Sequence, residues 1–173
     1  MNRAIFLDRD GIINRRPAEH DYVKSWEEFV FLPGVPEVIK ALRERGFLMV
    51  VVTNQRGVAR GLVSLEDLEA IHRRMKERLA KENAIIDGIY VCPHSDEDRC
   101  DCRKPEPGLL LKAREDLDID LSRSYMIGDS PVDIEAGKNA GCRTIMVVEE
   151  EMACLPEPDY TVKSLDRVLS FLF

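Results

Sequence analysis

The sequence predicts an α/β protein: a Rossmann-like parallel sheet with helices on both faces. Short, uniformly apolar runs alternate with amphipathic helical patterns along all 173 residues. Uniformly apolar runs are typical of strands buried on both faces, and strand–helix alternation is typical of parallel sheets with right-handed crossovers. Because neither an internal repeat nor a linker divides the chain, residues 1–173 are predicted to form one domain.

Three strands are predicted in the first half of the chain, at 4–7, 47–52 and 85–92. The helix predicted between the first two strands spans about 34–45, with Gly46 as its C-cap. Its buried face would consist of Val35, Val38, Ile39 and Leu42. The helix before the third strand opens at a predicted capping box, Ser64-x-x-Asp67, and its apolar face would consist of Leu68, Ile71, Met75 and Leu79.

Two further strands are predicted in the second half, at 124–128 and 142–148. The helices around them begin after Pro107, at Pro131 behind Ser130 as N-cap, and at Ser164. The first of these would bury Leu110, Ala113 and Leu117, and the last would bury Leu165, Val168, Leu169 and Leu172.

The charge balance and the apolar runs exclude two classes of protein. Lys plus Arg number 25 against 32 Asp plus Glu, a net charge of −7, which argues against a generic binder of nucleic-acid backbone. The longest apolar run, 47–52, is too short to span a bilayer. No signal peptide is visible and the five cysteines are an odd number, so we expect a cytoplasmic protein with reduced thiols, with a monomer as the default expectation.

Polar side chains follow four of the predicted strands. In chain order these are Asp8 and Asp10, then Thr53, Asn54 and Gln55, then Arg103 and Lys104, and finally Asp129 and Asp133. The carboxyl ends of parallel strands meet at one edge, where ligands bind. Four carboxylates crowded there require a cation such as Mg²⁺, together with Lys104. A carboxylate nucleophile, a hard cation, a lysine and a second carboxylate that moves protons indicate phosphoryl transfer.

Each of these signals has an ordinary structural explanation when it is taken alone. A D-x-D after a strand is usually a solvated turn, and Lys104 could be a solvated charge. Thr53 could satisfy backbone groups at a strand end, and the run 128–133 could cap a helix. The order of these motifs along the chain favours catalysis, because each motif follows a successive predicted strand. The sequence therefore predicts an enzyme.

Four segments in this order resemble the motifs of a known superfamily. "FLDRDG", "VVTNQ", "RKP" and "MIGDSPVD" resemble motifs I to IV of the haloacid dehalogenase superfamily of phosphatases. "YVKSWEEFVFLPGV", "TNQRGVARG" and "CPH…CDCRKP" resemble the group that contains D-glycero-D-manno-heptose 1,7-bisphosphate phosphatases and histidinol-phosphatases. The resemblance covers residues 3–150 and implies a haloacid dehalogenase-like fold.

The resemblance also implies roles for the aspartates. Asp8 would be the nucleophile that forms an aspartyl-phosphate, and Asp10 would protonate the leaving group and then activate water. Mg²⁺ would be held by Asp8, the backbone carbonyl of Asp10 and Asp129, with Asp133 supporting its water shell.

The remaining motif residues would hold the phosphoryl group. Thr53, Asn54 and the adjacent Gln55 would bind it, and Lys104 would neutralise it. The group has Thr or a similar residue where this chain has Ile12, a position outside the proposed chemistry.

No segment is long enough for a full cap domain, because 54–92 is predicted to be one crossover helix with flanking loops. Loops 13–31, 55–63 and 93–104 would therefore roof the site. Arg56, Arg60 and Arg103 are candidates to meet a second anion or sugar hydroxyls, although an exposed arginine such as Arg60 could equally be solvated. Hydroxyl contacts could also come from the first loop, through His20, Tyr22 and Glu28.

"GVARG" resembles the heptose bisphosphate type more than the histidinol-phosphate type. We therefore expect a heptose bisphosphate as the small phosphorylated substrate, with histidinol phosphate and a nucleic-acid 3′-phosphate as alternatives. A zinc-dependent nucleic-acid-binding module would need a basic, aromatic-bearing face, which this acidic chain does not indicate. A receiver-like switch would place its aspartate after a central strand, not after the first.

A cluster of cysteines and a histidine lies in the loop 92–102: Cys92, His94, Cys100 and Cys102. Side chains at i and i+2 of an extended backbone point the same way, so each pair can hold one side of a tetrahedron. Four such ligands predict a structural Zn²⁺ site with no open position. A disulfide and a chance cluster of free thiols are the alternatives.

Overall fold

The computed structural model of the protein describes residues 1–150, 153–170 and 172, and a six-stranded sheet lies at its centre. The strand order is β3-β2-β1-β4-β5-β6, and all five neighbouring pairs are parallel. The strands are β1 (Arg3–Leu7), β2 (Phe47–Asn54), β3 (Gly88–Cys92), β4 (Tyr125–Gly128), β5 (Arg143–Val147) and β6 (Tyr160–Val162).

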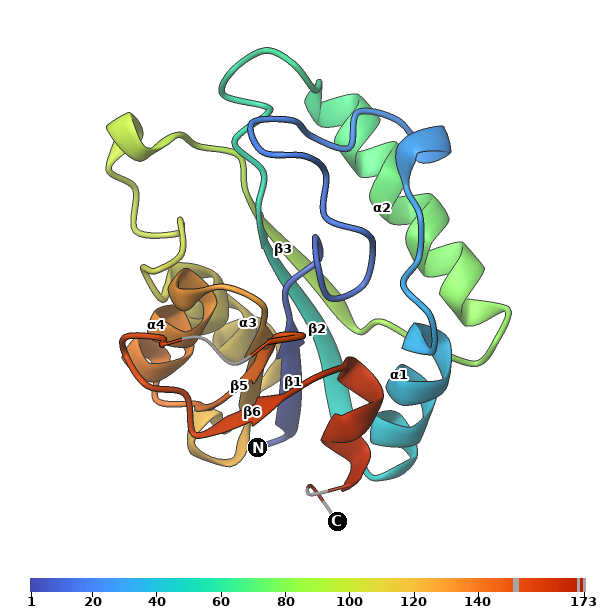
Figure 1. Ribbon diagram of the computed structural model, residues 1–173, viewed down its shortest axis with the longest axis vertical. Coiled ribbons are helices and arrows are strands. Elements are labelled where there is room, and N and C mark those ends of the chain that lie inside the picture. Colours follow the sequence, from blue (N-terminus) through green and yellow to red (C-terminus); the bar gives the residue numbers. More distant parts are fainter. Residues whose placement is uncertain (151–152, 171, 173) are drawn as a thin grey trace.

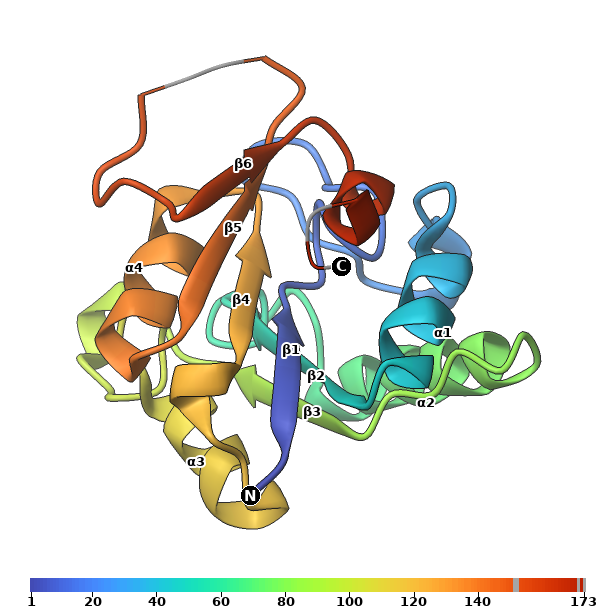
Figure 2. The same cartoon turned by 90° about the horizontal axis from the view of Figure 1, so that it is seen from below.

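Helices cover both faces of this sheet. Figures 1 and 2 show α1 (Val35–Glu44) and α2 (Leu65–Ala80) on one side, and α3 (Gly108–Leu117) and α4 (Pro131–Ala140) on the other. Alternate residues of β1 enter separate cores: Ile5 and Leu7 pack toward α1 and α2, and Ala4 and Phe6 pack toward α3 and α4. This double burial explains why residues 4–7 of β1 are uniformly apolar, and it confirms the predicted fold class.

The predicted elements are found, with shifted ends. β2 continues two residues further than predicted, to Asn54, and β3 begins at Gly88. The last predicted helix is a six-residue 3-10 helix, η4 (Leu165–Ser170), which buries Leu165 and Val168. β6 and the short 3-10 helices η1 (Trp26–Glu28), η2 (Asp96–Asp98) and η3 (Leu121–Arg123) were not predicted from the sequence.

The helices α2 and α4 begin at the predicted capping residues, Ser64 and Ser130, but the hydrogen bonds at Ser64 differ from those predicted. Ser64 Oγ accepts from the Asp67 N–H at 3.0 Å, but the Asp67 carboxylate binds the Ser64 hydroxyl at 2.6 Å, so only one half of the predicted box forms. Ser130 is the N-cap residue of α4 as predicted, and the Asp133 carboxylate accepts from its N–H at 3.2 Å and from its hydroxyl at 2.7 Å. This cap fixes Asp133 at the carboxyl edge of the sheet.

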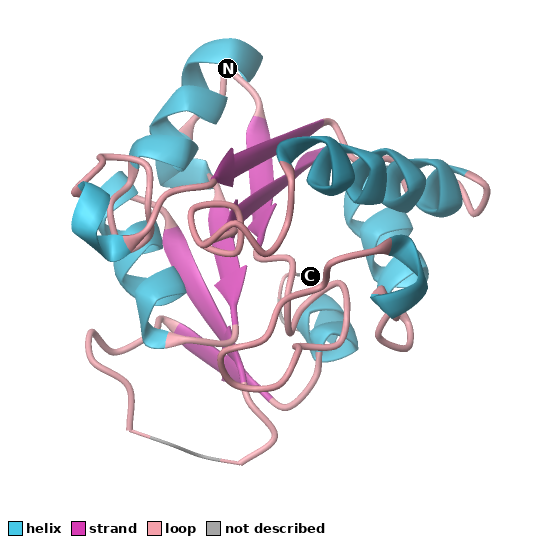
Figure 3. Ribbon diagram, turned by 90° about the horizontal axis from the view of Figure 1, so that it is seen from above, coloured by secondary structure: helices cyan, strands magenta, loops and turns pink. Residues whose placement is uncertain are grey.

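Long loops lie over the carboxyl ends of the strands. Figure 1 shows the segments 11–33 and 93–106 above this edge, and Figure 3, the view from above, shows loops over the strand ends. The part of the chain that the structure describes forms no large cap over this edge. Trp26, Phe29 and Phe31 anchor the first loop, with ring centroids 5.0–6.1 Å apart. None of the described helices is long and apolar enough to cross a membrane.

Candidate active site

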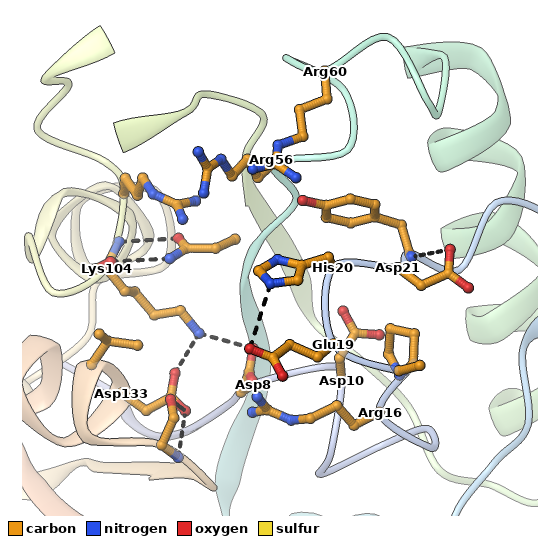
Figure 4. A pocket seen from close by; sticks show the side chains of 17 residues that line it. Asp8, Asp10, Arg16, Glu19, His20, Asp21, Arg56, Arg60, Lys104 and Asp133 are labelled. Atoms are coloured by element: carbon orange, nitrogen blue, oxygen red, sulfur yellow. Dashed lines mark hydrogen bonds and ion pairs between the residues drawn. The ribbon is translucent and has the colours of Figure 1, made fainter. Parts of the chain in front are cut away.

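A buried lysine joins two of the predicted aspartates at the carboxyl edge. Lys104 Nζ donates to Asp8 Oδ1 at 2.8 Å, to Asp133 Oδ1 at 2.6 Å and to the Val52 carbonyl at 2.9 Å. Lys104 is 3% exposed and Asp133 is 1% exposed (Figure 4). The three protons of the ammonium group are therefore all used, and together these bonds hold the side chain between the two carboxylates.

The positive charge of Lys104 does not balance the negative charges of Asp8 and Asp133. Burial raises the pKa of Asp8 to about 7, and Asp133 and Asp10 add to the rise, while Lys104 opposes it. For Lys104, burial alone would lower the pKa, but Asp133 and Asp8 outweigh it and raise the pKa. The lysine is thus a fixed cation, and one more cation is needed to keep Asp8 fully ionised near neutral pH.

Asp129 completes a cluster suited to a hard divalent cation. Carboxylate oxygens of Asp8, Asp129 and Asp133 all lie within 4.8 Å of one another. Burial raises the pKa of Asp129, against the opposing effect of Arg16. Arg16 Nε donates to Asp129 Oδ2 at 3.0 Å, and its Nη2 contacts Oδ1. Three converging carboxylates are a donor set of the type that Mg²⁺ binds.

Gly11 allows the Asp129 carboxylate to lie close to the turn that follows β1. Its φ of +93° lies in the left-handed region, and a Cβ there would stand 1.9 Å from Asp129 Oδ2. Any side chain at this position would therefore displace the carboxylate. The D-x-D-G sequence thus places Asp8 and makes room for Asp129 in the same turn.

Asp10 is held in a separate network of donors. Its carboxylate accepts from Asn14 Nδ2 at 2.8 Å and from Gln55 Nε2 at 2.9 Å, and Arg9 Nη2 donates to Oδ1 at 2.9 Å. Burial alone would raise the pKa of Asp10, but Arg9, Asn14 and Gln55 outweigh it and lower the pKa. Asp10 is therefore held as an oriented carboxylate, separate from the Lys104 cluster.

The side chains of the last two residues of β2, Thr53 and Asn54, and of Gln55, which follows the strand, have different surroundings. Asn54 clamps the backbone of Lys104, since its Nδ2 donates to the Lys104 carbonyl and its Oδ1 accepts from the Lys104 N–H, both at 3.0 Å. Thr53 and Gln55 are buried, and Gln55 Nε2 also donates to Thr53 Oγ1 at 2.9 Å. Only Asn54 of the three lines the cavity described next, so phosphate contacts of Thr53 and Gln55 stay predictions.

A cavity of about 440 Å³ opens above these groups. Its floor includes Asp8, Asp10 and Lys104, and segment 16–22 forms one wall (Figure 4). The first-loop candidates His20 and Tyr22 line it, whereas Glu28, whose carboxylate accepts from a backbone N–H at 2.8 Å, is not among the lining residues.

Three arginines also line this cavity: Arg56, Arg60 and Arg103. Figure 4 shows Arg56 and Arg60 among its lining side chains. Arg103 Nε donates to Asp96 Oδ1 at 2.6 Å, and Arg56 Nη1 lies 3.1 Å from Asp96 Oδ2. Asp96 therefore holds these two guanidinium groups together at the rim.

The cysteine-rich loop brings its four predicted ligands to one point. The Sγ atoms of Cys92 and Cys100 lie 3.6 Å apart, and those of Cys100 and Cys102 lie 3.5 Å apart. His94 Nδ1 lies 3.3 Å from Cys102 Sγ and 3.6 Å from Cys92 Sγ. Tetrahedral donors around zinc lie roughly 3.5–3.8 Å from one another, so these spacings fit Zn²⁺. All five cysteines are free thiols in the structure.

Four site residues were not predicted from the sequence: Arg9, Asn14, Arg16 and His72. Only His72 carried a readable signal, because it follows Leu68 by four residues and precedes Met75 by three, which places it on the apolar face of α2. Arg9, Asn14 and Arg16 read as ordinary polar loop residues.

Comparisons with known proteins agree with this geometry. A family described as HAD-hydrolase-like matches residues 101–168. The D-glycero-beta-D-manno-heptose-1,7-bisphosphate 7-phosphatase of Haemophilus ducreyi is 39% identical over 98% of this chain and 94% of its own length. The enzyme of that name from Escherichia coli K12 is 42% identical over 98% of this chain and 89% of its own length.

A solved structure also matches nearly the whole chain. It is the D,D-heptose 1,7-bisphosphate phosphatase of B. bronchiseptica complexed with magnesium and phosphate, and it aligns with a TM-score of 0.87. The two chains are 34% identical, over 98% of this chain and 97% of the other.

Proposed function

The chain belongs to the D-glycero-D-manno-heptose 1,7-bisphosphate phosphatase family of HAD-like phosphatases, and we propose that it removes one phosphate of such a sugar bisphosphate through an aspartyl-phosphate on Asp8. The observation that carries the proposal is the Lys104–Asp8 contact of 2.8 Å beside Asp129, Asp133 and the cavity. The names of the relatives put the scissile phosphate on carbon 7, and we propose the same position here.

In the first step, a carboxylate oxygen of Asp8 attacks phosphorus, and the bond from phosphorus to the sugar oxygen breaks. That oxygen takes a proton from Asp10, so the sugar leaves as an alcohol and Asp10 becomes a carboxylate. Arg9, Asn14 and Gln55 keep Asp10 ionised in the free protein, so Asp10 must take up this proton when the anionic phosphate of the substrate binds beside it. Lys104 stabilises the negative charge on the transferring group, because its ammonium is fixed 2.8 Å from Asp8 Oδ1.

In the second step, Asp10 takes a proton from water while the water oxygen attacks phosphorus. The bond between phosphorus and Asp8 breaks, inorganic phosphate leaves, and Asp10 is again protonated. The donors around Asp10 suit this step, because Asn14, Gln55 and Arg9 hold the carboxylate ionised and oriented.

Asp8 and Asp129 would hold Mg²⁺, with the backbone carbonyl of Asp10 as a further ligand and Asp133 supporting its water shell. Bound there, Mg²⁺ supplies positive charge to the transferring phosphoryl group and lowers the pKa of Asp8.

A substrate panel tests this function. Phosphate release should be fastest with the heptose 1,7-bisphosphate, slower with sugar monophosphates, and slowest with histidinol phosphate and a 3′-phosphorylated oligonucleotide. Histidinol phosphate carries an ammonium group, which three arginines at the cavity wall would repel. Efficient and preferred hydrolysis of histidinol phosphate would contradict the substrate assignment.

Arg60 and Arg103 are proposed to meet the remote phosphate of the substrate. Alanine at either position should lower kcat/KM for the bisphosphate about 10–100-fold, because a charged hydrogen bond to an anion is lost. A small monoester without the remote phosphate should change far less. The matched control is Arg123→Ala, in η3 before β4 and so at the opposite end of the sheet. Equal losses on both substrates would contradict these roles.

We also propose that Cys92, His94, Cys100 and Cys102 bind one structural Zn²⁺. The four donors fill a tetrahedron, so the metal would not take part in the reaction. Its task would be to fix the loop that delivers Lys104, which Asn54 then clamps by two backbone hydrogen bonds. The zinc loop would thus act on catalysis by positioning this lysine.

Loss of one zinc ligand should therefore affect stability first. Cys100→Ala should abolish the stoichiometric zinc seen by elemental analysis and lower Tm by roughly 5 °C or more, the effect of losing a cross-link worth ~2 kcal/mol. Activity should fall but should still require Mg²⁺. Cys154→Ala removes a thiol outside the cluster and should leave zinc content and rate unchanged. A wild-type protein purified without zinc would refute this proposal.

A further inference from the structure

Arg9 is a charged side chain with no exposed surface, next to the catalytic loop. Its side chain is 0% exposed, and it stands between Asp8 and Asp10 in the sequence. Nη2 donates to Asp10 Oδ1 at 2.9 Å and Oδ2 at 3.2 Å, and Nε donates to Oδ1 at 3.2 Å. The guanidinium therefore grips one edge of the Asp10 carboxylate with two of its nitrogens.

The third nitrogen of Arg9 contacts a residue of α2. Arg9 Nη1 lies 3.0 Å from His72 Nε2, and His72 is 7% exposed. A guanidinium can only donate, so Nε2 must accept and the imidazole proton must lie on Nδ1. Burial and the charge of Arg9 lower the pKa of His72 to about 3, so the ring stays neutral.

These contacts form a chain from the helix to the site. α2 packs into the core on one face of the sheet through Ile71, Met75 and Leu79, so His72 is carried by a rigid element. Phe29 lies beside the guanidinium, 5.9 Å from ring centroid to Cζ. The Arg9 guanidinium thus bridges two acceptors, the neutral imidazole of His72 on one side and the carboxylate of Asp10 on the other.

We propose that His72 is a positioning residue for proton transfer, which orients Asp10 through Arg9. Removal of the acceptor leaves Arg9 buried and charged against Asp10, so the local charge is kept. The direction of the guanidinium, and with it the direction of the carboxyl group, is no longer fixed. Small displacements of a proton donor are costly, and the cost should appear only in steps that need the proton.

This inference rests on the proposed function, because it assigns to Asp10 the protonation of the leaving oxygen. Two substrates separate the proton-dependent step from the rest. The heptose bisphosphate releases an alkoxide, which must be protonated, whereas p-nitrophenyl phosphate releases an anion that is stable near neutral pH. kcat/KM covers only the steps through phosphoenzyme formation, so the later activation of water does not enter it.

The test compares His72→Leu, which removes the acceptor, with His72→Gln, whose Oε1 reaches the place of Nε2. His72→Leu should lower kcat/KM about 10–100-fold for the bisphosphate and by no more than about threefold for p-nitrophenyl phosphate. His72→Gln should restore most of the loss. Asp10→Asn should show the same selectivity with a larger effect. Leu79→Ala, two turns along α2, should lower Tm without changing the ratio of the two substrates.

Three outcomes would overturn the inference. The first is equal loss on both substrates in His72→Leu, and the second is no recovery in His72→Gln. The third is nitrogen NMR that places the His72 proton of the wild-type protein on Nε2, which decides the matter even if His72→Leu does not fold. If the wild-type protein hydrolyses neither substrate, or if Asp10→Asn shows no selectivity, the proposed function itself fails and this inference fails with it.

Discussion

Asp8→Asn should abolish phosphate release, with a loss of at least about 10⁴-fold in kcat, the scale seen when a covalent nucleophile is removed. The amide has the same shape as the carboxylate but cannot attack phosphorus, and it is a poorer ligand for Mg²⁺. The measurement is steady-state phosphate release from the bisphosphate with Mg²⁺. Asp116→Asn, the same change on the exposed face of α3, should retain wild-type activity.

Asp8→Asn should also be more stable than the wild-type protein when no metal is present. The pKa of Asp8 is raised from 3.8 to about 7 by burial and by Asp133, so the folded state resists its ionisation. A carboxyl group with a raised pKa costs stability increasingly from pH ~4 upward, and the cost is complete above pH ~7. Thermal unfolding of Asp8→Asn above that pH, with a chelator, should therefore occur at a higher temperature. A lower unfolding temperature would contradict this electrostatic account.

Lys104→Met should have the second-largest effect, and it should reduce both activity and stability. The lysine is the protein's own cation between Asp8 and Asp133, with contacts of 2.8 and 2.6 Å. Its loss leaves two buried carboxylates unpaired, at a cost of about 3–5 kcal/mol in the free energy of unfolding. kcat should fall about 10²–10³-fold or more, because a preorganised charge at the phosphoryl group is removed.

The control for this variant is Lys112→Met, which removes an exposed lysine paired with Asp116 on α3. Its activity and cooperativity of unfolding should match those of the wild-type protein. If Lys104→Met kept activity within tenfold of wild type, Lys104 would not stabilise the transferring phosphoryl group.

Much of the fold follows from β1 and β2, whose residues are apolar on both faces because helices cover both sides of the sheet. Asp8 and Asp129 could be placed together for the same reason, since each follows a strand whose carboxyl end must lie at one edge. The convergence of Cys92, His94, Cys100 and Cys102 could be predicted because these four residues lie close in sequence. β6 was missed, since a three-residue edge strand with two exposed side chains has no apolar pattern.

The network behind Asp10 could not be predicted in the same way. Arg9 and His72 are 63 residues apart, and their contact depends on how α2 crosses the sheet. A charged residue in a loop is usually solvated, so nothing indicated that Arg9 would be wholly buried. The Arg16–Asp129 pair spans 113 residues and depends on the path of the first loop, which the sequence does not specify. Charge pairs between distant loops are set by tertiary packing alone.

The covalent role of Asp8 is the central claim, and mass spectrometry of the phosphoenzyme tests it most directly. Asp10→Asn with p-nitrophenyl phosphate and Mg²⁺ should accumulate the intermediate, because its formation needs no proton from Asp10 while its hydrolysis needs Asp10 as a base. After acid quenching, the chain should gain one phosphoryl group, and borohydride reduction should convert residue 8 to homoserine. A phosphoryl group on another residue, or p-nitrophenol released in a stoichiometric burst without any phosphorylated chain, would contradict the account.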